Sequence, residues 1–188
     1  MEQMDELRRP DASTRLMYRI VFAVSGVVIL GTWAWGVGTA ALFSSGSIPV
    51  IGQNMVNVSW PLPYFAQPVD YLCVASVTFF YTGIQLWQNK VAQWSHFLLA
   101  SLQLLAIVVA FATAYEIMYN FMLWGSYFSI QVLVNNLAIN PQLLSTPGPT
   151  PWNLGFATKM FSALFVVSAY SVYFLRKVHQ VTGLPDEI

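Results

Sequence analysis

The chain has 188 residues, of which 56% are hydrophobic and 9% are charged, and its eight basic residues balance its eight acidic ones. Soluble domains carry about 25% charged residues, so this composition excludes an ordinary soluble domain and indicates an integral membrane protein. The balanced charge excludes a basic surface for nucleic acid, and the single cysteine, Cys73, excludes an internal disulfide or a cysteine-based zinc site within the chain.

The first predicted span covers residues 20–43 and follows a polar stretch in which Asp11 is a suitable N-cap. This apolar run is longer than the hydrophobic region of a signal peptide and has no small-residue cleavage site after it, so we interpret it as a true span. Thr32, Gly36 and Ala40 recur at intervals of four on one helical face. Small residues at this spacing let a neighbouring helix approach closely, although the tolerance of membrane helices for glycine explains them equally well.

Residues 44–68 carry no charge and contain four prolines, which predicts a loop lying against the membrane. Its aromatic residues Trp60, Tyr64 and Phe65 suit the headgroup level. The tripeptide that begins at Asn57 matches an N-glycosylation acceptor, a short and common pattern.

The second predicted span runs over residues 69–87, and a short polar link at residues 88–90 turns the chain back. The third span covers residues 94–123, a stretch without glycine or proline in which Glu116 is the only full charge at neutral pH. As a helix it would reach roughly 45 Å, enough to cross a bilayer with some tilt. Residues 124–139 are also uncharged, and they either extend this helix or lie along the membrane surface.

Four prolines at positions 141, 147, 149 and 151 exclude regular helix before the fourth span, which covers residues 154–175 and ends in Arg176 and Lys177. Seven of the eight basic residues then lie on one side of four spans, which the positive-inside rule makes cytoplasmic. The sequence therefore predicts an all-α protein of the plasma membrane, with one transmembrane domain over residues 1–188. We expect a four-helix bundle with both termini in the cytoplasm and two long apolar external loops.

Three charges lie within or beside the spans, on different helices: Asp70, Glu116 and Lys159. The helical rise places each of them near the external boundary of a hydrocarbon layer about 30 Å thick. Charges are costly there unless they are paired or hydrated, so we predict an intramembrane charge cluster. Alternatively, Lys159 extends to the interface and Asp70 caps the second span. For Glu116, an ion pair with Lys159 or a contact with another subunit is favoured over catalysis.

Few other residues suggest chemistry. His96 and His179 fall at the cytoplasmic ends of two spans, where we favour interfacial side chains over a two-histidine haem or metal site. Cys73 is interpreted as a small buried apolar residue. Phosphate-binding loops, nucleophile elbows and zinc-protease motifs are absent from the sequence. We therefore assign no catalytic, cofactor-binding or metal-binding residue.

The segments YEIMYNFMLW at 115–124 and PWNLGFATKMFSALF at 151–165, followed by SVYFLRK ending at Lys177, resemble known sequences. They are similar to small four-span membrane proteins of ammonia-oxidising archaea, which include accessory subunits of the archaeal ammonia monooxygenase. The likeness covers roughly the second half of the chain and rests on general character. It implies a copper-dependent membrane complex in which other subunits hold the copper, so that no metal ligand transfers to a position in this chain.

Three functions follow as hypotheses. The first is a non-catalytic accessory subunit that forms a hetero-oligomer with other membrane subunits and contacts lipids, but not nucleic acid. The second is a small transporter or channel that uses Asp70, Glu116 and Lys159. The third is a membrane enzyme with a small lipid or quinone substrate; it predicts an apolar pocket on the cytoplasmic side of Glu116 and assigns no residues.

Overall fold

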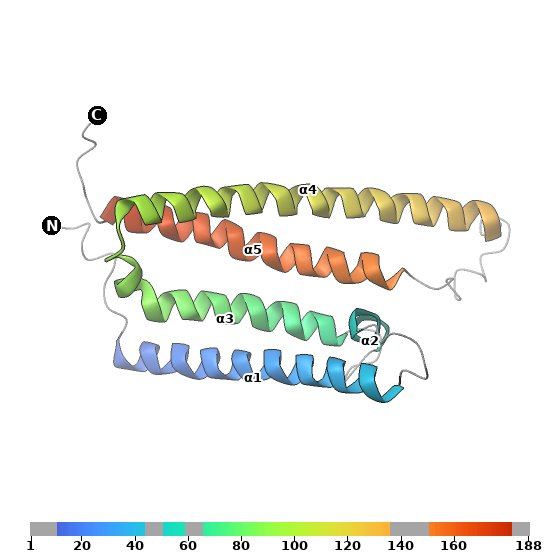
Figure 1. Ribbon diagram of the computed structural model, residues 1–188, viewed down its shortest axis with the longest axis horizontal. Helices are drawn as coiled ribbons and strands as arrows, with labels where there is room; N and C mark the ends of the chain where they lie inside the picture. Colours follow the sequence, from blue (N-terminus) through green and yellow to red (C-terminus); the bar gives the residue numbers. More distant parts are fainter. Residues whose placement is uncertain (1–10, 44–50, 59–65, 136–150, 182–188) are drawn as a thin grey trace.

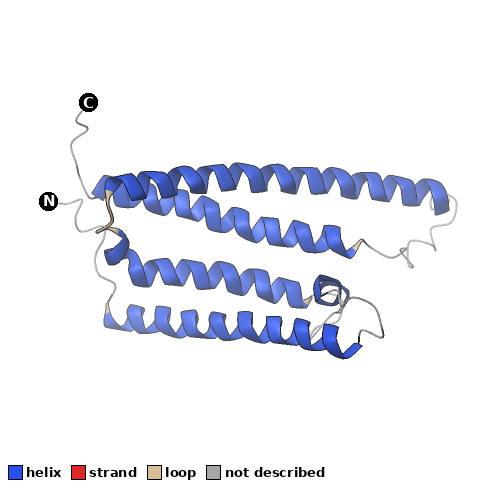
Figure 2. Cartoon of the chain, viewed as in Figure 1, coloured by secondary structure: helices blue, strands red, loops and turns tan. Residues whose placement is uncertain are grey.

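A computed structural model describes residues 11–43, 51–58, 66–135 and 151–181, and every regular element in these ranges is an α-helix. The elements are α1 (Ala12–Phe43), α2 (Ile51–Asn57), α3 (Pro68–Val91), α4 (His96–Asn135) and α5 (Trp152–Val181). All except α2 are long and apolar enough to cross a membrane. The prediction of an all-helical protein with four membrane-spanning helices is confirmed at this level (Figures 1 and 2).

The helices form two antiparallel hairpins that lie side by side (Figure 1). Helix α1 packs against α3, α3 packs against α5, and α5 packs against α4, so α5 and α3 are the inner pair. We call the end where α1 begins and α5 ends the basic end, because Arg15, Arg19, Lys90, Arg176 and Lys177 lie there. The opposite end, which holds α2, is called the loop end.

The helices extend beyond the predicted spans, since α1 begins at Ala12 and α5 ends at Val181, and the turn between α3 and α4 lies elsewhere than expected. The predicted polar link at residues 88–90 is instead the last turn of α3, and the chain reverses at residues 92–95. Lys90 suits that position because a cation near a helix C-terminus interacts favourably with the helix dipole. Residues 124–139 were expected either to extend the third span or to lie along the membrane surface. As far as Asn135 they extend it, because α4 continues to that residue without a break.

The α1–α3 interface is built from two phenylalanines and two glycines. The rings of Phe22 and Phe79 stack with their centroids 4.1 Å apart. The Phe79 ring lies 3.3 Å from the position that a Cβ atom on Gly26 would take, and the Phe22 ring lies 3.2 Å from the corresponding position on Gly83. Each glycine is one turn away from the phenylalanine of its own helix. The two helices therefore interlock reciprocally, since each glycine leaves space for a ring of the other helix.

Helix α2 lies within the range 44–68, where the sequence predicted a loop against the membrane. It packs instead between the loop ends of α1, α3 and α5, and the side chain of Met55 is fully buried. A Cβ atom on Gly36 would lie 2.5 Å from Cε of Met55, so the glycine is what allows α2 to approach α1. Gly36 and Ala40 are buried and Thr32 is half-buried, so the small-residue face packs partly against this short helix. Residues 59–65, with the three aromatic residues placed at the headgroups, lie outside the described residues.

Buried apolar side chains form two separate clusters. At the basic end, Leu99, Phe174 and Val178 pack together with their neighbours, and at the loop end Met55, Val69 and Leu72 do the same. Between the clusters, most large apolar side chains are exposed, including Val27, Leu30 and Leu104. This distribution is expected for membrane helices, because the surrounding hydrocarbon is as apolar as a protein core.

We predict that Gly26→Leu destabilises the protein by about 1–3 kcal/mol, because the new side chain must displace the Phe79 ring. The measurement is thermal unfolding of the purified chain in detergent. The matched control is Gly31→Leu on the same helix, where an added Cβ meets nothing within 4 Å. Equal unfolding temperatures for the two variants would contradict the interlocked interface.

Candidate functional site

The charged site at the loop end is centred on an ion pair between α3 and α5. Nζ of Lys159 lies 2.8 Å from Oδ1 of Asp70. The other carboxylate oxygen of Asp70 accepts a hydrogen bond of 3.0 Å from the backbone N–H of Gln67, the residue before α3. Lys159 also donates a hydrogen bond to the side-chain oxygen of Gln67. One carboxylate therefore stabilises the start of α3 and joins it to α5.

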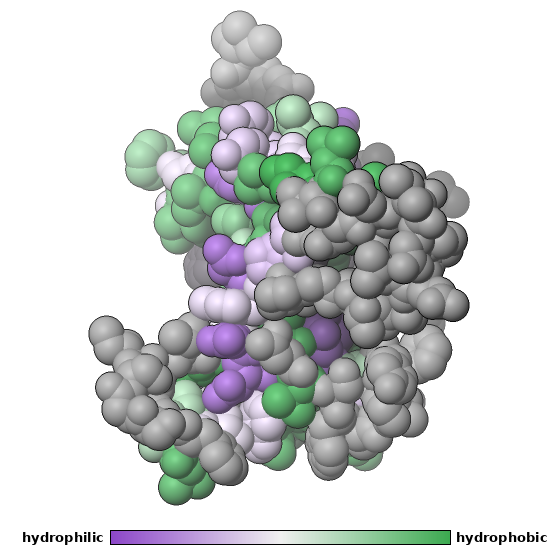
Figure 3. Space-filling view, turned by 90° about the vertical axis from the view of Figure 1, so that its right-hand side faces the viewer, coloured by the Kyte–Doolittle hydropathy of each residue, from purple (hydrophilic) through white to green (hydrophobic). Residues whose placement is uncertain are grey.

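The pair is partly accessible, since the side chains of Lys159 and Asp70 are 33% and 36% exposed. Each side chain compensates the charge of the other, because an unpaired ionised group at the edge of hydrocarbon is costly in free energy. Hydrophilic residues gather midway across the loop end, between hydrophobic surfaces (Figure 3). This arrangement fits an anchor between hairpins.

Glu116 lies at a similar depth but takes no part in the pair. In the antiparallel register of α4 and α5, His96 lies beside His179 and Trp124 reaches Gly155, which places Glu116 opposite residues 159–163. Lys159 nevertheless extends towards α3, and among the described residues Glu116 has no ion pair. The structure thus brings Asp70 and Lys159 together and leaves Glu116 on a different helix interface.

Next to Glu116, the face of α4 that packs on α5 is polar. Thr113 is 3% exposed and its hydroxyl donates to the carbonyl of Val109 at 2.8 Å. Asn120 is 5% exposed, and its Nδ2 has no hydrogen-bond partner among the described residues. Leaving such a donor unpaired costs about 1–3 kcal/mol. The sequence alone does not show that Asn120 is buried, because its burial depends on which face of α4 meets α5.

The other side chains considered for chemistry form pairs but no larger site. The rings of His96 and His179 lie with their centroids 5.3 Å apart in an edge-to-face arrangement. Sγ of the half-buried Cys73 lies 3.8 Å from Sδ of Met160. Within the described ranges, no group of three or more histidine, cysteine, aspartate or glutamate residues could hold a metal ion.

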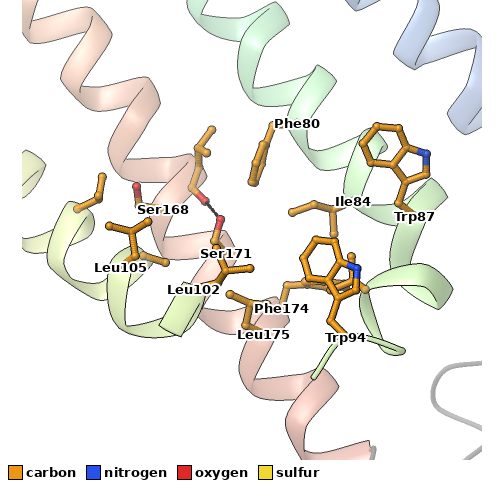
Figure 4. Close-up of a pocket in the computed structure, with 14 residues that line it drawn as sticks. Phe80, Ile84, Trp87, Trp94, Leu102, Leu105, Ser168, Ser171, Phe174 and Leu175 are labelled. Atoms are coloured by element: carbon orange, nitrogen blue, oxygen red, sulfur yellow. Dashed lines mark hydrogen bonds between the residues drawn. The ribbon is translucent and has the colours of Figure 1, made fainter. Parts of the chain in front are cut away.

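A feature that the sequence did not place is an apolar cleft of about 370 Å³ near the basic end (Figure 4). Helices α3 and α4 form its sides and α5 forms its floor. Its last α4 residue towards the loop end is Val109, so it lies on the basic side of Glu116, where the membrane-enzyme hypothesis expected an apolar pocket. The two serines in its lining, Ser168 and Ser171, donate their hydroxyl protons to carbonyls of their own helix, at 2.7 Å each. The cleft therefore offers a binding surface without a reactive group in its described lining.

Comparison with protein-family models, with curated proteins and with solved structures finds no match to this chain.

We predict that Asp70→Asn and Lys159→Gln are coupled. The asparagine side chain of the first variant would still accept the hydrogen bond from the Gln67 N–H, so this pair of substitutions isolates the charge interaction. A double-mutant cycle on thermal unfolding in detergent should give a coupling energy of about 0.5–1 kcal/mol. Replacing Lys159 and Glu116 together, each by glutamine, should give additive effects. Coupling of Glu116 with Lys159 instead of Asp70 would contradict the geometry.

Proposed function

We propose that this chain is a non-catalytic accessory subunit of a multi-subunit membrane complex, and that the loop end of α4 is the surface that docks a partner protein. The observation that carries the proposal is the length of α4. Its 40 residues correspond to about 60 Å, twice the thickness of the hydrocarbon core.

Helix α4 rises past the helix on which it packs. The Trp124 ring lies beside Gly155, in the first turn of α5. Residues 125–135 therefore begin level with the first turn of α5 and run about 16 Å towards and past its start (Figure 1). We call these residues the α4 extension.

The α4 extension carries no charge, and the large side chains that it is described as exposing are apolar. Its exposed large side chains are those of Phe128, Ile130, Val132 and Leu133, between 42% and 76% exposed. The hydroxyls of Ser126 and Ser129 bond back to carbonyls of α4, so they offer little to water. Fully burying a side chain of this size is favourable by about 1.5–3 kcal/mol. A helix with such a surface beyond the other spans is best covered by another protein.

The base of the α4 extension has the composition of an interface centre. The rings of Trp124 and Phe128 stack with their centroids 5.6 Å apart, and Tyr127 meets both rings edge-on. Tryptophan and tyrosine are enriched among the residues that dominate binding energy in interfaces. Because three rings already support one another, they lose little side-chain freedom on docking.

The positive-inside rule places the basic end and both termini in the cytoplasm, so the α4 extension and its partner are external to the plasma membrane in this proposal. The resemblance of residues 115–124 and 151–177 makes the archaeal ammonia monooxygenase the complex to test. In that setting copper belongs to partner subunits, and this chain supports them.

The transporter alternative receives no support from the described residues. Asp70 and Lys159 pair between α3 and α5, whereas Glu116 lies on α4. None of the three charges lines the apolar cleft. A common pathway for an ion through all three is therefore not part of our proposal.

We predict that a photo-crosslinking amino acid at Leu133 captures a specific partner protein in native membranes. The same label at Leu104, an exposed residue in the half of α4 nearer the basic end, should capture mainly lipid. The crosslinked bands are identified by mass spectrometry, and capture of an ammonia monooxygenase subunit would identify the complex. Extraction of the chain as a lone monomer or homo-oligomer, with no protein adduct at Leu133, would overturn the proposal.

A further inference from the structure

The apolar cleft at the basic end has the length of one membrane leaflet. Its α3 lining runs from Phe80 to Val91, which is about 16 Å along the helix. Half of a hydrocarbon core is about 15 Å. The cleft begins in the turn between α3 and α4, at Trp94, and therefore reaches from the interface to about the middle of the bilayer.

The cleft is also narrow. A volume of about 370 Å³ over this length corresponds to a mean cross-section of about 23 Å². A helix with its side chains is about 10 Å wide and needs roughly 80 Å². A single methylene chain, packed with carbon atoms at about 4 Å from its neighbours, needs roughly 15–20 Å². The volume of the cleft therefore matches one alkyl chain more closely than a transmembrane helix.

The lining makes no demand for hydrogen bonds. Apart from its two serines, whose hydroxyls are already bonded within α5, the side chains are apolar or aromatic. In Figure 4 the ring of Phe80 and the side chains of Ile84 and Leu105 border the same space. An occupant with polar atoms along its length would leave them unpaired, which favours plain hydrocarbon.

The entrance to the cleft has the chemistry of a headgroup site. Trp87 and Trp94 line it and are 60% and 43% exposed, and indole rings favour the membrane interface. Lys90 lies between them in sequence and is exposed, as is Arg176 in the last turns of α5. Lys90 and Arg176 each follow or precede a residue that lines the cleft, and their positive charges favour an anionic headgroup.

We propose that the cleft binds one hydrocarbon tail of an anionic membrane lipid, with the headgroup beside Trp87, Lys90 and Trp94. The proposal is independent of the accessory-subunit function, because the cleft lies at the end of the molecule opposite to the α4 extension. The tail fills the space between the two hairpins and so completes their packing.

The first test maps lipid contacts on the unmodified chain. The chain is reconstituted in vesicles that contain phosphatidylglycerol with a photoreactive diazirine near the end of one acyl tail. We expect adducts on Phe80 and Leu105 to exceed those on Val24 and Val27 by roughly tenfold, since the latter face ordinary lipid on α1. Even labelling of all lipid-facing residues would overturn the proposal.

The second test fills the cleft. Ala106 lines it, whereas Ala112 is exposed on the same helix, so Ala106→Phe and Ala112→Phe are matched substitutions. In native mass spectrometry from detergent, we expect the unmodified chain and Ala112→Phe to retain one phosphatidylglycerol in preference to phosphatidylcholine. Ala106→Phe should reduce the retained lipid by roughly tenfold. Equal retention by both variants, or no preference between the two lipids, would count against a specific anionic-lipid site.

A label at Leu105 also separates the lipid from a protein occupant. A photo-crosslinking amino acid at this position in native membranes should give lipid adducts. Adducts to a protein there would show that a partner side chain fills the cleft, and would overturn the lipid proposal while leaving the accessory-subunit proposal intact.

Discussion

The structure depends on one constraint, the cost of an unpaired polar group in hydrocarbon. Every element within the described residues is helical, which satisfies the backbone internally. Hydroxyl groups obey the same constraint: Ser25, Thr82 and Ser168 are buried in spans, and each donates to a carbonyl one turn earlier. Asp70 and Lys159 meet it by pairing at the loop end. Among the described residues, Asn120 with its unpaired Nδ2 and Glu116 without an ion pair do not meet it.

Apolar side chains gain no hydrophobic free energy by moving from lipid hydrocarbon into the protein. The interior of this bundle is therefore determined by how closely the helices can pack. Gly26 and Gly83 let α1 and α3 interlock, and Gly36 lets α2 close the loop end. Where no such fit exists, a cleft lined by α3, α4 and α5 remains. The same reasoning separates the two proposed contacts. A narrow space within the membrane suits a lipid tail, and a broad apolar surface beyond it suits a protein.

The sequence predicted the features that depend on composition and helical rise. Four apolar runs became four helices long and apolar enough to cross a membrane, and the similar depths of Glu116 and Lys159 agree with the register of α4 and α5. The sequence did not predict the direction in which Lys159 extends. The helical rise per residue gives the depth of a side chain in the membrane, but it does not tell which face of α5 meets α3. The sequence also missed α2, and it assigned no residues to the apolar pocket that one hypothesis expected, since both features arise from the way separate helices pack. The exact end of α3 escaped prediction because Gln88 and Asn89 are compatible with a last helical turn as well as with a link.

The central claim is that the α4 extension is covered by another protein. The most direct measurement is the reactivity of Leu133→Cys with a membrane-impermeant maleimide, in a chain whose only cysteine, Cys73, is replaced by alanine. The account predicts protection in native membranes and rapid labelling when the purified chain is alone in vesicles. Equal labelling of the introduced cysteine in both settings would contradict the account. Labelling in both would show that no partner covers the residue, and labelling in neither would show that lipid covers it.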